Sequence, residues 1–299
     1  MRLRRLSLRD RRLFDRFLRL SPHELSVYAF ANIYIWKNLF DIYWVVIEDS
    51  LCVFFKDSIG CFLYIPPQGG RIEAGVIEQA FGIMDRFNSN KQISRIENLE
   101  ADKLAFYQAL GYECIYKSSD YLCRRIDLAR LRGNRFKSQR ACFNYFLKHY
   151  HYAYLPFSLR YKDACLRLYD LWARERKHKT QDTVYQGMLG DSRSCLEVLL
   201  HDYQDLGLMG RVVKIDKEVK AFTFGFRLNQ DTFCILYEIA DITLKGLAQY
   251  IFQKFCSDLR GYKYINIMDD LGLENLKKVK FSYHPIRLIP NYIIKRRNA

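Results

Sequence analysis

The amino-acid sequence predicts an α/β fold with mixed sheets, built as two similar domains in tandem. The length of 299 residues is about twice that of an ordinary domain. Apolar residues make up 49% of the chain and aromatic residues 15%, which is enough to form two packed cores. One order of predicted elements occurs twice: helix, three-strand meander, helix, strand, helix, strand.

The first half of the chain holds the first copy of this order. Leu13, Phe14, Phe17 and Leu18 lie at helical spacing, and Gly111 is placed to end a later helix. The predicted elements are a helix (8–20), three strands (41–47, 51–55 and 61–65), a helix (71–87), a strand (93–97), a helix (101–110) and two strands (112–116 and 121–126).

The second half repeats the order. The predicted elements are helical material (159–200), three strands (208–215, 219–228 and 232–240), a helix (244–259), a strand (264–268), a helix (273–279) and a last strand (292–295). Because a meander is antiparallel and crossover connections are parallel, each sheet is expected to be mixed. We therefore expect one domain over residues 1–127, a second over 155–299, and a basic connecting helix over 128–154.

Cysteine usage and hydropathy bear on cofactors and location. The nine cysteines are scattered singly, without a CxxC pair or a Cys/His cluster at zinc-ligand spacing, so we expect no metal. Their odd number, with no recognisable secretion signal, suggests reduced thiols in a cytoplasmic protein. The longest apolar stretch, residues 27–36, is too short to span a bilayer.

Positive charge is concentrated in three segments. The net charge is +15, whereas residues 1–20, 124–148 and 274–297 carry +6, +7 and +6, so the rest of the chain carries −4. This distribution favours an anionic partner, and RNA, a phosphate-bearing donor or an anionic lipid surface at the membrane periphery would each fit. Solvated helix faces are the alternative for any one segment. No particular oligomeric state is predicted.

Several motifs carry a resemblance to a known family. The segment FYQALGYE (106–113) resembles a segment of GNAT acetyltransferases in which a helix ends at glycine and a strand begins. Three further blocks are similar to the tandem-GNAT family related to the C-terminal domain of phosphatidylglycerol lysyltransferases. They are DLARLRGNRF (127–136), continuing to Arg140, Asn144 and Phe146; YEIAD (237–241); and INIMDDLGLENLKKVKFSYHP (265–285).

The resemblance covers the chain well from about residue 118 onward. It implies a transferase that takes an aminoacyl group from a charged tRNA and passes it to an amine or hydroxyl of a lipid or peptide. The family pattern favours a charged residue near Ile239 and polar residues near Ile267 and Met268, and this chain departs from it at those places.

The turns where GNAT enzymes hold the donor pyrophosphate are atypical. Residues 66–71 (PPQGGR) have two glycines but also two prolines, which lack the N–H donors that bind phosphate, and residues 245–248 (KGLA) have a single glycine. Both are expected to be plain turns. Acyl-CoA is therefore the alternative donor, behind aminoacyl-tRNA.

Candidate site residues gather at strand ends in the second half. Glu238 ends an apolar strand, and Asn266 and Asp270 lie at or just beyond the end of the next, where open α/β sheets bind ligands; we expect these three to be catalytic. A structural ion pair for Glu238 and a helix cap for Asp270 are the alternatives. The residues expected to bind substrate are Asp241 (otherwise a helix cap), Asp269, Lys277, Lys280, Ser282 and Tyr283.

Basic residues that follow the first domain form the expected RNA or anion contact. These are Arg135, Lys137, Arg140 and Lys278, with a solvated helix face as the alternative for Lys277 and Lys278. Aminoacyl transfer needs positioning and a donor to the developing oxyanion, and no protein nucleophile is expected. We therefore expect an acyltransferase of the aminoacyl type; an acyl-CoA N-acyltransferase and a non-catalytic GNAT-fold module for RNA or an anionic ligand are the alternatives.

Overall fold

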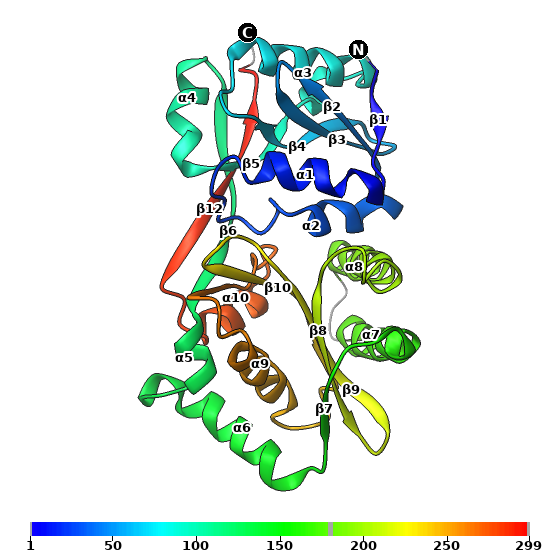
Figure 1. The fold of residues 1–299 in the computed structure, drawn as a ribbon, viewed down its shortest axis with the longest axis vertical. Coiled ribbons are helices and arrows are strands. Elements are labelled where there is room, and N and C mark those ends of the chain that lie inside the picture. Colours follow the sequence, from blue (N-terminus) through cyan, green and yellow to red (C-terminus); the bar gives the residue numbers. More distant parts are fainter. Residues whose placement is uncertain (1, 179–181, 298–299) are drawn as a thin grey trace. The chain divides into compact units, whose positions relative to one another are not determined.

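A computed structural model describes residues 2–178 and 182–297 of the chain (Figure 1). The chain forms two compact units. The first consists of residues 1–120, 269–272 and 288–299, and the second of residues 121–268 and 273–287. From the sequence, the first domain was expected over residues 1–127 and the second over residues 155–299.

The first unit is a mixed sheet with helices. Its strands are β1 (Arg4–Arg5), β2 (Asp41–Ile47), β3 (Ser50–Lys56), β4 (Cys61–Gln68), β5 (Ile96–Glu100) and β12 (Arg287–Lys295), in that order, followed by β6 (Glu113–Arg124). The helices are η1 (Leu8–Asp10), α1 (Arg11–Leu18), α2 (Phe30–Tyr34), η2 (Ile35–Asn38), α3 (Ala74–Phe87), η3 (Lys91–Ile93), η4 (Ala101–Lys103) and α4 (Leu104–Ala109). Among these strands, β4 and β5 form a parallel pair.

The second unit continues from the end of β6 in the order β6-β11-β10-β9-β8-β7. Its strands are β7 (Ala153–Pro156), β8 (Met209–Ile215), β9 (Glu218–Arg227), β10 (Thr232–Ala240) and β11 (Tyr264–Asn266). Its helices are α5 (Arg125–Arg130), η5 (Asn134–Phe136), α6 (Lys137–His149), η6 (Leu159–Tyr161), α7 (Lys162–Lys177), α8 (Thr183–His201), α9 (Leu247–Asp258) and α10 (Glu274–Phe281). Helices α7 and α8 lie on one side of its sheet, and α6 and α9 on the other (Figure 1).

The predicted α/β class with mixed pairing is confirmed, and the repeated meanders are β2-β3-β4 and β8-β9-β10. Two details were wrong. The two strands expected over 112–116 and 121–126 are one strand, β6, because the polar residues between them stay extended. The last strand begins at Arg287 rather than near 292, and it pairs with β5. Helix α6 lies within the segment 128–154 that was expected to connect the domains, and it packs against α9.

Gly246 fixes the approach of α6 to the start of α9. Its φ is +85°, and a Cβ atom placed there would lie 2.1 Å from the carbonyl oxygen of Cys142 in α6. Leu247, Tyr250 and Ile251 of α9 share a buried cluster with Phe146 of α6, so this approach helps to close the core of the unit.

We expect Gly246→Ala to lower the free energy of unfolding by roughly 2–4 kcal/mol, because alanine adds both a left-handed backbone penalty and a backbone clash. Urea unfolding followed by circular dichroism measures the loss. Gly261→Ala is the matched control, because a Cβ there meets no atom within 4 Å. Equal losses in the two variants would contradict the close approach at Gly246.

Candidate active site in the second unit

The parallel strands β10 and β11 separate soon after they pair. Their register runs only from Thr232↔Tyr264 to Cys234↔Asn266, after which β11 ends while β10 continues to Ala240. A bulge interrupts β10 against β9 between Ile235 and Tyr237. Bulges re-aim side chains and are frequent beside active sites. Glu238 follows this bulge directly.

One oxygen of the Glu238 carboxylate is buried without a hydrogen bond. Glu238 as a whole residue is partly accessible, but its Oε2 atom is buried and accepts no hydrogen bond from any described residue. Burial raises the pKa of Glu238 from 4.5 to about 8, and the positive charge of Lys280 opposes this rise. An uncompensated buried carboxylate destabilises a fold, so it usually marks a functional site.

Two weakly polar side chains lie near Glu238. Cys256 of α9 and Tyr283 belong to one buried cluster of the second unit. Burial raises the pKa of Cys256 and of Tyr283, and the charge of Glu238 adds to the rise in both.

Lys280 brings a positive charge into the same interior. It is 9% exposed, its Nζ donates a hydrogen bond to the carbonyl oxygen of Ile267, and it lies 5.8 Å from the ring centroid of Tyr121. The turn after α10 is fixed as well: Gln139 Nε2 donates to the carbonyl oxygen of Ser282 at 2.5 Å, and the ring of Tyr283 lies 4.2 Å from that of Phe252. Lys280 and Tyr283 are thus held by the core and do not lie on the solvent face of α10.

Two other candidate residues, Asn266 and Asp241, accept hydrogen bonds from backbone amides two residues further along the chain. Asn266 is buried, and its Oδ1 accepts a hydrogen bond from the amide of Met268 at 2.7 Å, which supports the left-handed φ of 61° at that residue. Asp241 accepts from the amide and the hydroxyl of Thr243 and pairs with Lys220 at 3.4 Å. Burial alone would raise the pKa of Asp241, but these contacts outweigh it, and the pKa is lowered.

Asp269 and Asp270 fall in the short segment that joins the first compact unit, and Asp270 accepts from the amide of Gly272 at 2.9 Å. Glu238 belongs to the second unit. The expectation of one cluster that contains Glu238 and both aspartates therefore stays a prediction.

The basic candidate residues differ in whether their side chains have partners in the structure. Lys277, Lys278 and Lys137 are exposed, and Lys277 pairs with Glu274 at 3.3 Å. Arg135 pairs with Asp127 at 2.7 Å, and Arg140 donates to the carbonyl oxygens of Leu131 and Gly133. Ser282 Oγ donates to the carbonyl oxygen of Val279 at 2.7 Å. Arg135 and Arg140 thus have structural partners where α5 ends and α6 begins.

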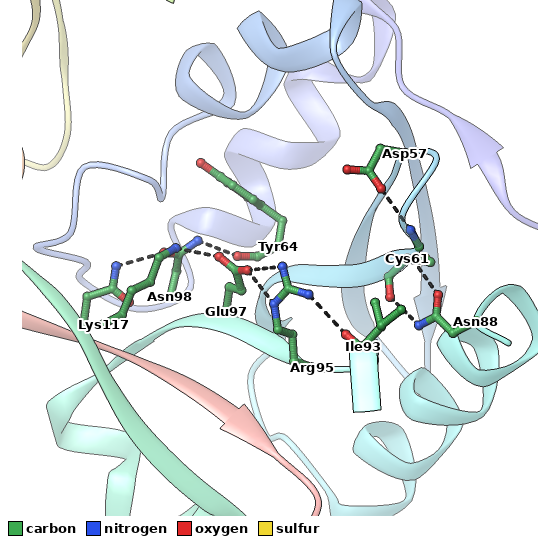
Figure 2. A network of polar contacts seen from close by, with 11 residues as sticks. Asp57, Cys61, Tyr64, Asn88, Ile93, Arg95, Glu97, Asn98 and Lys117 are labelled. Atoms are coloured by element: carbon green, nitrogen blue, oxygen red, sulfur yellow. Dashed lines mark hydrogen bonds and ion pairs between the residues drawn. The ribbon is translucent and has the colours of Figure 1, made fainter. Parts of the chain in front are cut away.

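The corresponding place in the first unit is closed by hydrogen bonds. Strands β4 and β5 pair at Leu63↔Ile96, and beyond this point Asn98, with φ +61°, donates to the carbonyl oxygen of Tyr64 at 2.7 Å (Figure 2). Glu97 there accepts from Lys117 and from Arg95, and these contacts outweigh burial and lower its pKa. This network compensates the carboxylate, in contrast to Glu238.

Each of the two turns with an atypical pyrophosphate sequence contains one closely packed glycine. A Cβ on Gly69 would lie 2.5 Å from Ser50 Oγ, so this glycine packs on the β2–β3 turn, whereas a Cβ on Gly70 would meet no atom within 4 Å. At the start of α9, the carbonyl oxygen of Cys142 faces Gly246.

No group of three or more His, Cys, Asp or Glu residues is placed to hold a metal ion within residues 2–178 and 182–297. Within the same ranges, no helix is long and apolar enough to cross a membrane.

The neighbours of Glu238 were only partly predictable from the sequence. Cys256 was expected only to be a reduced thiol, and the structure buries it. The available signal was the position of Cys256 on the apolar stripe of the predicted helix 244–259, which must pack on the strand that carries Glu238.

The fold and the comparisons agree on the class of protein. A tandem GNAT protein from the clavulanic acid biosynthesis pathway matches with a TM-score of 0.50 at 9% identity, covering 100% of this chain and 99% of that one. The chain is accordingly a mixed α/β protein of the tandem GNAT-like class. It belongs to the family of phosphatidylglycerol lysyltransferase C-terminal domains, whose model matches residues 18–295.

Two further solved structures are similar along nearly their whole length. A conserved protein of unknown function from Bacteroides thetaiotaomicron VPI-5482 is 27% identical, with a TM-score of 0.88 and coverage of 99% of both chains. The L-PGS of Bacillus licheniformis is 15% identical, with a TM-score of 0.64 and coverage of 96% of this chain and 92% of that one. No curated protein matches the chain. Family membership supports an acyl or aminoacyl transferase as the general class of activity.

Proposed function

We propose that the chain transfers an aminoacyl group from an aminoacyl-tRNA to an amine or hydroxyl acceptor on a lipid or peptide, with Glu238 as the general base. The observation that carries the proposal is the buried, uncompensated Oε2 of Glu238 where β10 and β11 separate. A carboxylate with a pKa of about 8 is matched to accepting a proton near neutral pH.

The chemistry requires no protein nucleophile. For an amine acceptor, the nitrogen attacks the ester carbonyl carbon of the donor, and its proton passes to Glu238. The new N–C bond forms, the C–O bond to the ribose breaks, and the departing ribose oxygen takes up a proton that Glu238 can return. The apolar surroundings strengthen each of these interactions, because water screens them little.

The direct test is transfer of a labelled amino acid. The purified chain is incubated with bulk tRNA charged with labelled amino acids, together with total lipid extract or with peptides that carry free amines. Label is expected in one acceptor fraction. The control replaces charged tRNA with deacylated tRNA plus free labelled amino acid. Absence of transfer to both acceptor classes would instead favour a non-catalytic binding module.

Acyl-CoA is the competing donor, and the atypical turns argue against it, because residues 66–71 contain two prolines and residues 245–248 contain a single glycine. Because stabilisation follows the logarithm of ligand concentration over Kd, 1 mM acetyl-CoA is expected to raise the Tm by less than about 1 °C. Thermal unfolding with and without acetyl-CoA measures this shift, and equimolar pyrophosphate controls for general anion binding. A rise of several degrees with acetyl-CoA alone would support the acyl-CoA alternative.

A further inference from the structure

A row of arginines runs along the first helical segment of the first unit. Arg9, Arg12, Arg16 and Arg19 follow one another at intervals of three, four and three residues through η1 and α1 and just past the end of α1. This spacing places them on one helix face. All four are exposed, and we call them the arginine stripe.

The core of the unit fixes the direction of the arginine stripe. On the opposite face of the helix, Phe14, Phe17 and Leu18 are 0%, 6% and 7% exposed, and Phe14 packs edge-on against Phe30 and Trp44. Because this apolar face cannot leave the core, the arginine stripe must point to solvent.

Little of this charge is neutralised within the unit. Arg9 and Arg12 have no ion-pair partner in the described part of the chain. Arg19 has only a 3.8 Å contact with Asp15, and the guanidinium of Arg16 lies 5.1 Å from the ring centroid of Phe17. The carboxylate of Asp10 is occupied by the amide and the hydroxyl of Ser7.

The shape of the arginine stripe suits a phosphate backbone. At 1.5 Å per residue, ten residues extend over roughly 15 Å, a length that can contact more than one phosphate of a nucleic-acid strand. Residues 1–20 contain eight arginines and no lysine. The guanidinium fork binds phosphate oxygens in pairs, whereas an ammonium acts as a point charge.

A membrane surface fits less well. An interfacial helix inserts its apolar face between lipids, but the apolar face of α1 is in the core of the unit. We propose that the arginine stripe is a docking surface for the phosphate backbone of an RNA strand. This inference rests on the proposed function and adds to it an RNA contact for the tRNA donor. The contact lies away from Arg135 and Arg140, whose side chains have partners within the chain.

The test is RNA binding by the full chain, measured by fluorescence anisotropy with labelled deacylated tRNA between 50 and 200 mM salt. The variant is Arg12→Glu with Arg16→Glu. The matched control is Arg167→Glu with Arg174→Glu, which makes the same charge change at exposed positions of α7. The stripe variant should bind at least about tenfold more weakly, with a salt slope reduced by about two, because two phosphate contacts are lost. The control should bind as the wild type does, within a factor of about three.

Three outcomes would overturn the inference. The first is an equal loss in both double variants. The second is absence of salt-sensitive tRNA binding by the wild type, including the case in which it binds vesicles with 30% anionic phospholipid. The third is unchanged binding in Arg12→Glu with Arg16→Glu. The milder pair Arg12→Gln with Arg16→Gln, with melting curves for every variant, separates a binding defect from a folding defect.

The same measurements separate this inference from the proposed function. If the arginine stripe governs tRNA binding but the wild type transfers no amino acid, the inference holds and the proposed function fails. If the wild type transfers an amino acid and the stripe variant still binds tRNA fully, the proposed function holds and the inference fails.

Discussion

Glu238→Gln is expected to lower aminoacyl transfer by at least about 100-fold, the usual contribution of a general base. Glutamine keeps nearly the same volume in the space beyond the bulge of β10 but cannot accept the proton of the acceptor. The same change is expected to raise the free energy of unfolding, because it removes a carboxylate whose Oε2 is buried without a hydrogen bond. An inactive but more stable variant is the combination that a functional carboxylate predicts.

The sign of the stability effect follows from proton binding. The pKa of Glu238 is raised from 4.5 to about 8, so between these two pH values the folded chain holds a proton that the unfolded chain has released. Folding stability therefore falls as the pH rises through this window, by on the order of 5 kcal/mol at most. The Gln variant lacks this decline. Its advantage over the wild type should be absent near pH 4.5 and full above pH 8.

The measurements are urea unfolding at pH 5, 7 and 9 and initial rates of transfer, corrected for spontaneous hydrolysis of the donor ester. Glu175→Gln is the matched control: Glu175 lies on α7 of the same unit and is exposed. It should change neither property. A loss of stability in Glu238→Gln at every pH would mean that the carboxylate has a structural partner, and the catalytic assignment would then fail.

The fold was largely predictable because its elements have strong local signals. The strand expected at 41–47 has these bounds in the structure, since alternating burial and the following polar turn both mark it. The pairing of β12 was not predictable, because partner choice depends on contacts between residues about 190 apart in sequence, such as Asn291 with Glu100. Local patterns contain no information on which distant edge a strand will join.

The candidate site was predictable in part, for a comparable reason. Glu238 was conspicuous as a carboxylate in an apolar strand, and its environment in the structure is unusual as well. Arg135 and Arg140 were assigned to RNA from charge density alone. The sequence does not reveal that Arg140 donates to the carbonyl oxygens of Leu131 and Gly133, because those acceptors are backbone atoms of a helix end.

Lys280→Met is expected to shift the pH dependence of transfer toward higher pH. The charge of Lys280 lowers the pKa of Glu238 against the larger effect of burial, so its removal should raise that pKa further. Tyr283 and Cys256, which also surround Glu238, have raised pKa values because they are buried, and they supply no positive charge in its place. Below the new pKa, the rate should fall about tenfold for each pH unit of the shift.

Lys280→Met also removes the donor to the carbonyl oxygen of Ile267, which should destabilise the unit by about 1–3 kcal/mol. Lys280→Arg keeps the charge and should keep most of the profile. Lys254→Met, at an exposed position of α9 in the same unit, should leave rate and stability nearly unchanged. Full pH–rate profiles of the three variants distinguish two roles for Lys280. Recovery of Lys280→Met at high pH means that Lys280 acts through Glu238, whereas a uniform loss at every pH means that it binds the substrate directly.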